Sequence, residues 1–140
     1  MYYLIYVSSA AVPMSSDDLL FLLERSRAKN VCLGITGMLV YMRGSFMQML
    51  EGDKQVILEL FESIKRDSRH TGVIEIMAGE IQHRNFENWS MGFSNMDEAG
   101  DFRALGDYLE VNLGLRTFQK DAEHARKFMI SFSRRDQQIT

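Results

Sequence analysis

Three polar side chains occupy positions where the hydrophobic pattern of the sequence predicts a buried core. Gln48 lies in the apolar segment Phe46–Leu50, and Tyr6 lies in the alternating segment Tyr2–Ser8. Asn30 ends the apolar stripe of a predicted helix. A buried amide or hydroxyl needs hydrogen-bond partners, and an unmet group costs roughly 1–3 kcal/mol. We therefore expect Tyr6, Asn30 and Gln48 to converge, either on one another or on a polar ligand.

Two interpretations of this polar cluster are consistent with the residues. In the first, the three side chains satisfy one another and fix the register of the strands. In the second, they line a pocket for a flat ligand with carbonyl and imide groups, because an asparagine can bond an imide N–H and a carbonyl together. The residue types alone leave both interpretations open.

The elements that would position these side chains alternate between strands and helices. Pro13 and the polar cluster Ser15–Asp18 end the first strand and cap a helix that runs to about Lys29. The order β-α-β-β-α-β with a short fifth strand is typical of a ferredoxin-like α+β sandwich, in which both helices lie on one sheet face. The predicted strands are Tyr2–Ser8, Ile35–Met42, Ser45–Leu50, Gly72–Ile81 and Ser90–Ser94, and the second helix is Asp53–Asp67.

The other face of this sheet is also apolar and must be covered. Met47 points away from the helices if its neighbour Gln48 points toward them. The expected cover is a terminal amphipathic helix, Thr117–Arg134, which packs on its own sheet or on that of a neighbour. We therefore expect a domain of residues 1–95 and a C-terminal helical extension, 96–140, that covers the sheet or mediates oligomerisation.

Composition narrows the function classes. The chain has 140 residues, of which 46% are hydrophobic and 25% charged, and its net charge of −3 comes with no basic cluster. Because there is no basic cluster to neutralise phosphates, we expect no binding to nucleic acid. No apolar run approaches the ~18–20 residues that a helix needs to cross a bilayer. The start lacks a basic secretory signal, so we expect a cytoplasmic protein without membrane contact. The single Cys32 is expected to be a buried, inert thiol, and no metal-ligand spacing is present.

Two other functions of the same fold class are disfavoured by individual segments. An acylphosphatase-like enzyme needs an anion-binding loop with arginine, and Ser8–Ser15 contains no arginine. An RNA-binding sheet needs basic and paired aromatic residues, which are missing around Met91–Ser94.

Successive motifs of the chain resemble those of BLUF domains, in the same order and at matching spacings. No single motif is specific, but together they are very specific and cover residues 1 to about 95. They favour the ligand pocket over the self-satisfied cluster. The motifs are Tyr6-Val7-Ser8, Asn30, Gly34–Tyr41, Phe46–Gly52, Asp67–His70 and Arg84–Phe93.

The resemblance implies a blue-light photoreceptor, not an enzyme, that holds FAD (in some members FMN) non-covalently between the two helices. Ile35 and Ile64 would sandwich the flavin ring, and Asn30 would bond its pyrimidine edge. Tyr6 would give an electron to the excited flavin, and Gln48 would pass the proton. The glutamine, rotated or tautomerised, would then donate a new hydrogen bond to the flavin C4 carbonyl. The implied cofactor-binding residues are Tyr6, Asn30, Ile35, Gln48, Ile64, Asp67, Arg69 and His70.

The resemblance also implies an output path. Trp89 and Met91 are similar to the family's pair that exchanges position near the glutamine, and Ser8 is a further candidate for this relay. For Trp89 and Met91 the alternative interpretation is ordinary core packing. For Ser8 the alternative is a solvated residue at a strand end. Lys29 stands where relatives often carry Asn, His or Arg near the flavin. Ser63 stands where some relatives carry Arg. We expect the signal to pass to a separate effector protein, and we expect homo-oligomers.

Overall fold

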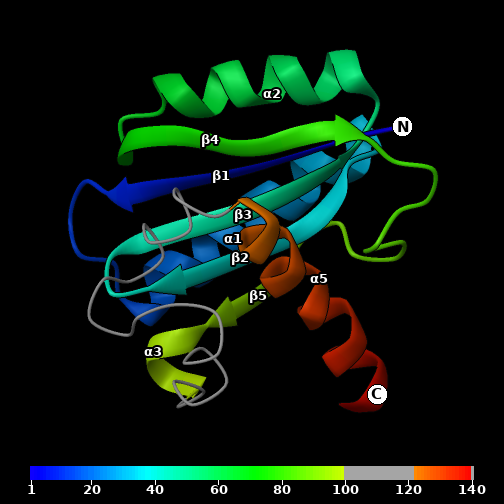
Figure 1. The fold of residues 1–140 in the computed structure, drawn as a ribbon. Coiled ribbons are helices and arrows are strands. Elements are labelled where there is room, and N and C mark those ends of the chain that lie inside the picture. The colour runs from blue at the N-terminus through cyan, green and yellow to red at the C-terminus, as the bar shows by residue number, and fades with distance from the viewer. Residues whose placement is uncertain (100–121, 140) are drawn as a thin grey trace.

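The computed structural model describes residues 1–99 and 122–139. Their secondary structure follows the predicted order, and Figure 1 shows the sheet with α1 behind it and α5 in front. The elements are β1 (Tyr2–Ala10), α1 (Ser16–Leu33), β2 (Thr36–Met42), β3 (Ser45–Gly52), α2 (Lys54–Arg66), β4 (His70–Glu80), β5 (Gly92–Asn95), α3 (Met96–Ala99) and α5 (Ala122–Ile139).

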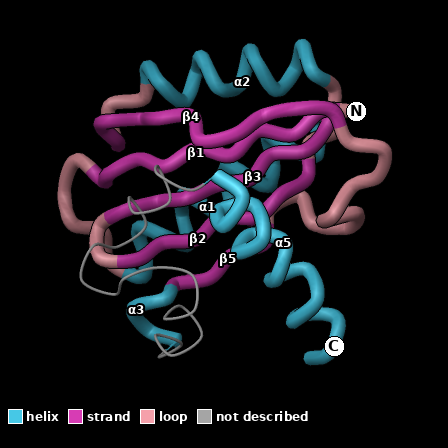
Figure 2. Tube along the Cα trace, in the orientation of Figure 1, coloured by secondary structure: helices cyan, strands magenta, loops and turns pink. Residues whose placement is uncertain are grey.

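The strands form one sheet in the order β4-β1-β3-β2-β5. β1 pairs antiparallel with both β3 and β4, β2 pairs antiparallel with β3, and β5 runs parallel to β2. Because β1 and β2 flank β3 in the same direction, α1 crosses over one face of the sheet, as right-handed crossovers require. The predicted ferredoxin-like α+β fold with a short fifth strand is thereby confirmed (Figure 2).

Capping residues set the ends of the two helices that face the sheet. Ser15 accepts from the backbone N–H of Asp18, whose carboxylate bonds the Ser15 N–H, so α1 begins with a capping box. α1 ends at Gly34, whose φ of 68° is easily adopted only by glycine. Asp53 caps α2 through the Val56 N–H. α1 therefore runs one turn beyond the predicted Lys29 and carries Asn30 inside the helix.

Each face of the sheet has its own hydrophobic cluster. The side chains of α1 and α2 pack with Leu4 and Leu50 on one face. On the other face, Met47 and Met49 pack with Phe128 and Met129 of α5. Alternation along β3 thus separates Gln48 from the methionines beside it. α5 lies on the sheet of its own chain, and the first residues of the predicted helix, 117–121, lie outside the described residues.

Besides the longer α1 and small shifts in the ends of other elements, two details differ from the predictions. β5 is Gly92–Asn95, slightly later than the predicted strand. Cys32 is exposed rather than buried. It lies two residues beyond the buried Asn30, which places it about 200° around the helix, on the side away from the sheet. Within the described ranges, none of the helices is long and apolar enough to cross a membrane.

Candidate functional site

A cavity of about 270 Å³ opens between α1, α2 and the sheet. This volume lies near the lower end of the roughly 300–1,000 Å³ that is usual for small-molecule sites. Its wall is mixed, with apolar side chains around a small number of polar groups. The lining residues are Tyr6, Met14, Leu22, Arg25, Ser26, Lys29, Asn30, Leu39, Phe46, Gln48, Leu60, Ser63, Ile64, Asp67, Arg69 and His70.

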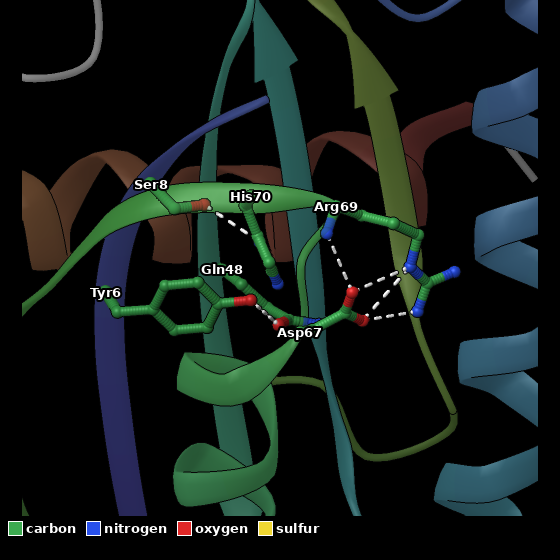
Figure 3. A network of polar contacts seen from close by, with 6 residues as sticks. All are labelled: Tyr6, Ser8, Gln48, Asp67, Arg69 and His70. Carbon is green, nitrogen blue, oxygen red and sulfur yellow. Dashed lines mark hydrogen bonds and ion pairs between the residues drawn. The ribbon is translucent and has the colours of Figure 1, made fainter. Parts of the chain in front are cut away.

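Tyr6 and Gln48 lie directly opposite each other in the β1–β3 ladder and on the same sheet face. The Tyr6 hydroxyl donates to Oε1 of Gln48 at 2.5 Å, as Figure 3 shows. Both side chains are almost fully buried, at 2% and 6% exposure. Burial raises the pKa of the Tyr6 phenol above its ordinary value, with a smaller contribution from the Asp67 charge, so the phenol keeps its proton at neutral pH.

The other end of the Gln48 amide faces a thioether. Nε2 of Gln48 lies 3.3 Å from Sδ of Met91, and Met91 is buried in the same cluster as Tyr6. Trp89, two residues earlier, packs on the opposite sheet face against Phe86, with the ring centroids 5.4 Å apart. Gly92 makes room for this indole, since a Cβ there would lie 2.4 Å from the Trp89 ring. Met91, and not Trp89, therefore contacts the glutamine in this structure.

Asn30 links α1 to the segment before β5. Its Nδ2 donates to the backbone carbonyl of Ser90 at 2.7 Å. A carbonyl only accepts, so this bond fixes the NH₂ group toward Ser90 and turns Oδ1 the other way. Among the residues that the structure describes, none donates to that oxygen. Because Asn30 lines the cavity, its oxygen and its second amide hydrogen suit a ligand edge that alternates donor and acceptor.

The end of α2 and the start of β4 place three polar side chains at the cavity. Asp67 accepts from the Arg69 guanidinium, which lowers the pKa of the Asp67 carboxyl to about 2. Nδ1 of His70 lies 3.2 Å from Oγ of Ser8, and burial lowers the pKa of His70 (Figure 3). Ser8 is fully buried rather than solvated, on the same face as Tyr6.

The predicted cofactor-binding residues line the cavity together with one exception. Ile35 is buried in the same cluster, but it lies in the α1–β2 connection against Gly52 and does not reach the cavity wall. The expected sandwich of a ring between Ile35 and Ile64 stays a prediction. Leu22 of α1 lines the cavity with Ile64. Leu22 follows from the helical period of α1, whereas no periodic pattern indicates how deep Ile35 lies.

Sequence reasoning also missed a buried carboxylate. Glu51, at the end of β3, is fully buried and accepts from the backbone N–H groups of Asn85 and Phe86, at 2.8 and 2.9 Å. Arg84 donates to the Gly34 carbonyl and to the Thr36 hydroxyl, at 2.7 and 2.8 Å. The Glu51 bonds hold the β4–β5 connection, which carries Trp89 and Met91, against the strand that carries Gln48, and the Arg84 bonds hold it against the start of β2.

Comparison with known proteins places these features in a family. Residues 1–92 match the family model BLUF, described as sensors of blue-light using FAD. The photoactivated adenylate cyclase subunit beta of Euglena longa is 36% identical over 107 residues, which are 76% of this chain and 12% of that protein. The chain thus spans only about an eighth of the length of this relative.

Solved structures show the same likeness. BlrB, a BLUF protein in its dark state, is 32% identical with a TM-score of 0.74, and the match covers 93% of this chain and 96% of that one. BlrP1 of Klebsiella pneumoniae, solved with FMN and cyclic diGMP, is 30% identical with a TM-score of 0.66, over 86% of this chain and 34% of that one.

Proposed function

The chain belongs to the BLUF family of blue-light sensors that use flavin, and on this premise we propose that Tyr6 and Gln48 are its photochemical pair. The observation that carries the proposal is the hydrogen bond between the buried Tyr6 hydroxyl and Oε1 of Gln48, at a cavity between the two helices. A BLUF domain is a sensor and not a catalyst, so the pair switches a signal and converts no substrate.

The residues of the cavity fit a flavin. Asn30 presents an unbonded carboxamide oxygen and a spare amide hydrogen, which match an imide N–H beside a carbonyl. Leu22 and Ile64 offer apolar contacts for a ring. Arg69, together with Lys29, adds positive charge suited to a phosphate-bearing side chain. We propose FAD as the cofactor, with FMN as the alternative, and Asp67 and His70 as further cofactor-binding residues.

In this proposal Tyr6 is the electron donor and Gln48 carries the proton. A bound flavin would supply a group that absorbs blue light and can then accept one electron. Tyr6 would supply this electron, its oxidised phenol would become strongly acidic, and Oε1 of Gln48 would accept the proton and relay it toward the ring. When the electron and proton have returned to Tyr6, Gln48 would be left rotated or tautomerised, and its amide would then donate to the C4 carbonyl of the ring. Tyr6 can donate or accept, so it can partner either form of the amide.

We propose that Met91 and Trp89 relay this change to β5. Met91 contacts the amide that reorients, at 3.3 Å from Nε2. Trp89 follows through the same backbone segment and packs on the far sheet face, where α5 lies. Ser8, bonded to His70 beside the pair, is proposed to transmit the change along β1. Such a local hydrogen-bond switch needs only a small energy difference to bias an output.

The output is proposed to act on another protein. BLUF domains commonly work with effector proteins or effector domains, and standalone members exist. We propose that residues 1–95 form the flavin-binding domain and that 96–140 form an extension whose helix α5 passes the signal to a separate effector. We also propose that this photoreceptor works in the cytoplasm as a homo-oligomer, without contact to nucleic acid or membranes.

An absorption spectrum of the purified chain tests the proposal. It is recorded in the dark, during blue illumination and after return to darkness. A flavin spectrum that shifts slightly to the red in light and then recovers is expected, and extraction of the pigment separates FAD from FMN. A colourless protein that takes up neither added FAD nor added FMN contradicts the proposed function.

A further inference from the structure

Three consecutive carbonyls before β5 are each held by a different donor. The Trp89 carbonyl accepts from the backbone N–H of Gly37 at 3.0 Å. The Ser90 carbonyl accepts from Nδ2 of Asn30 at 2.7 Å, and the Met91 carbonyl accepts from Nε of Arg27 at 2.8 Å. These three bonds fix the segment 89–91, which carries the Met91 thioether that faces Gln48.

Arg27 and Asn30 are suited to act together. They are three residues apart in α1, so both side chains project from the same side of the helix. Asn30 is buried at the cavity, whereas Arg27 is exposed and reaches Met91 from outside. The guanidinium carries a permanent charge, which makes its bond to the Met91 carbonyl stronger than a neutral one.

We propose that Arg27 is a positioning residue of the light switch: by holding the Met91 carbonyl, it keeps the thioether where the Gln48 amide must return, and so speeds recovery in the dark. This inference rests on the proposed function. Arg27 does not line the cavity, and it acts on Gln48 only through Met91.

The physical argument concerns the path back from the lit state. Reorientation of the Gln48 amide breaks its contact with Met91, and recovery must remake that contact. While Arg27 holds the Met91 carbonyl, the Met91 thioether stays in its dark-state position. Without the bond, the segment must be ordered again on the way to the dark state, which raises the barrier. In this proposal the hydrogen bond from Arg27 to the Met91 carbonyl is already formed in the transition state of recovery. Its loss therefore slows recovery and does not only change the final equilibrium.

The test compares dark-recovery rates in the full chain loaded with FAD. Arg27→Met keeps the length of the side chain and removes the donor, and Arg27→Lys restores a positive donor. Arg66→Met, an exposed arginine in the last turn of α2, is the matched control. We expect recovery in Arg27→Met to be slower by roughly fivefold or more, recovery in Arg27→Lys to be intermediate, and Arg66→Met to match the wild type. Flavin content and the size of the light-induced shift are expected to stay unchanged.

A double-mutant cycle separates positioning from a merely structural role. In a Met91→Leu background, removal of Arg27 should alter the recovery rate much less than in the wild type, because the thioether it positions is gone. Unchanged or faster recovery in Arg27→Met overturns the inference, as does an equal slowing in both backgrounds. A wild-type chain that binds FAD but shows no shift overturns the proposed function itself, whereas a normal wild-type photocycle with an unaltered Arg27→Met rate overturns only the role of Arg27.

Discussion

The hydroxyl of Tyr6 lies 2.5 Å from Oε1 of Gln48, across the β1–β3 ladder. The ladder holds both backbones, so the pair can change through the orientation of the amide and the place of the proton. A phenol can donate to the amide oxygen or accept from the amide nitrogen, and each arrangement satisfies Tyr6. The pair therefore has two hydrogen-bonded states, which is the property a switch requires.

Replacing Gln48 with leucine tests the proposed role of Gln48 as the proton carrier. Leucine has a similar volume and no polar groups, so the fold and flavin binding should persist. The light-induced red shift should disappear, because no side chain remains to change its hydrogen bonding. Difference absorption spectra measure this, with the exposed Gln82→Leu as control. A Gln48→Leu variant with a normal photocycle would remove Gln48 from the proposed mechanism.

Replacing Tyr6 with phenylalanine tests the electron donor. The ring still packs against Phe61, at 5.5 Å between centroids, so the fold should persist, although Oε1 of Gln48 loses its buried donor at a cost of roughly 1–3 kcal/mol. Flavin should still bind, and the normal shift should be lost because the phenolic proton and the accessible electron are gone. Tyr41→Phe, at another buried tyrosine of the same cluster, is the control and should keep its photocycle. An intact shift in Tyr6→Phe would mean that a different group donates.

Alternation and helical period were enough to predict which side chains share the cavity face. Tyr6 and Gln48 followed from strand alternation, and Asn30 from the stripe of α1. Such patterns assign a face but no depth along it. Ile35, whose place beside a flavin ring is implied only by the family resemblance, lies buried before β2 and outside the cavity lining, whereas Leu22 of α1 lines the cavity.

Contacts to backbone groups of distant segments could not be predicted. Glu51 reads in the sequence as a charge at a strand end, where charges are usually solvated. It is buried because the Asn85 and Phe86 N–H groups of a connection more than thirty residues away meet it. The bond from Arg27 to the Met91 carbonyl is of the same kind. Neither leaves a periodic signal, because the acceptor or donor is main chain and exists at every residue.

Replacing Asn30 with alanine should weaken flavin binding. The change removes the carboxamide proposed to meet the ligand edge and also leaves the Ser90 carbonyl without its donor. Loss of buried hydrogen bonds worth about 1–3 kcal/mol corresponds to a roughly fivefold to 150-fold weaker affinity. Titration of the apoprotein with FAD measures it, and the exposed Asn88→Ala is the control. An unchanged affinity would show that the cofactor edge lies elsewhere.

Replacing Glu51 with leucine should destabilise the fold. The N–H groups of Asn85 and Phe86 and the Asn85 amide would lose their acceptor, and the Phe86 N–H would do so while fully buried. Loss of hydrogen bonds to a charged group predicts a fall of about 2–4 kcal/mol in the free energy of unfolding. Denaturant unfolding measures this, and Glu87→Leu, an exposed residue of the same connection, should have little effect. Wild-type stability in Glu51→Leu would show that the connection is held by its other contacts.

Stability should fall as the pH drops below about 6.5, and His70 should be one cause. Burial lowers the pKa of His70 below its ordinary value of 6.5, Arg69 lowers it further, and Asp67 partly opposes the shift. Below pH 6.5 the unfolded chain takes up a proton that the folded chain refuses, so the free energy of unfolding decreases with falling pH until the lowered pKa is reached. Asp67 stays charged throughout this window, because its own pKa is about 2.

Denaturant midpoints between pH 7.5 and 5.5, a window set roughly around the ordinary histidine pKa, measure this effect. The decline should be shallower in His70→Gln, which keeps a hydrogen-bonding group beside Ser8 and cannot be protonated. His83→Gln is the matched control, because His83 is an exposed histidine away from the cavity, and its decline should follow the wild type. If His70→Gln and the wild type lose stability equally over this range, the burial of His70 does not govern the acid sensitivity of the fold.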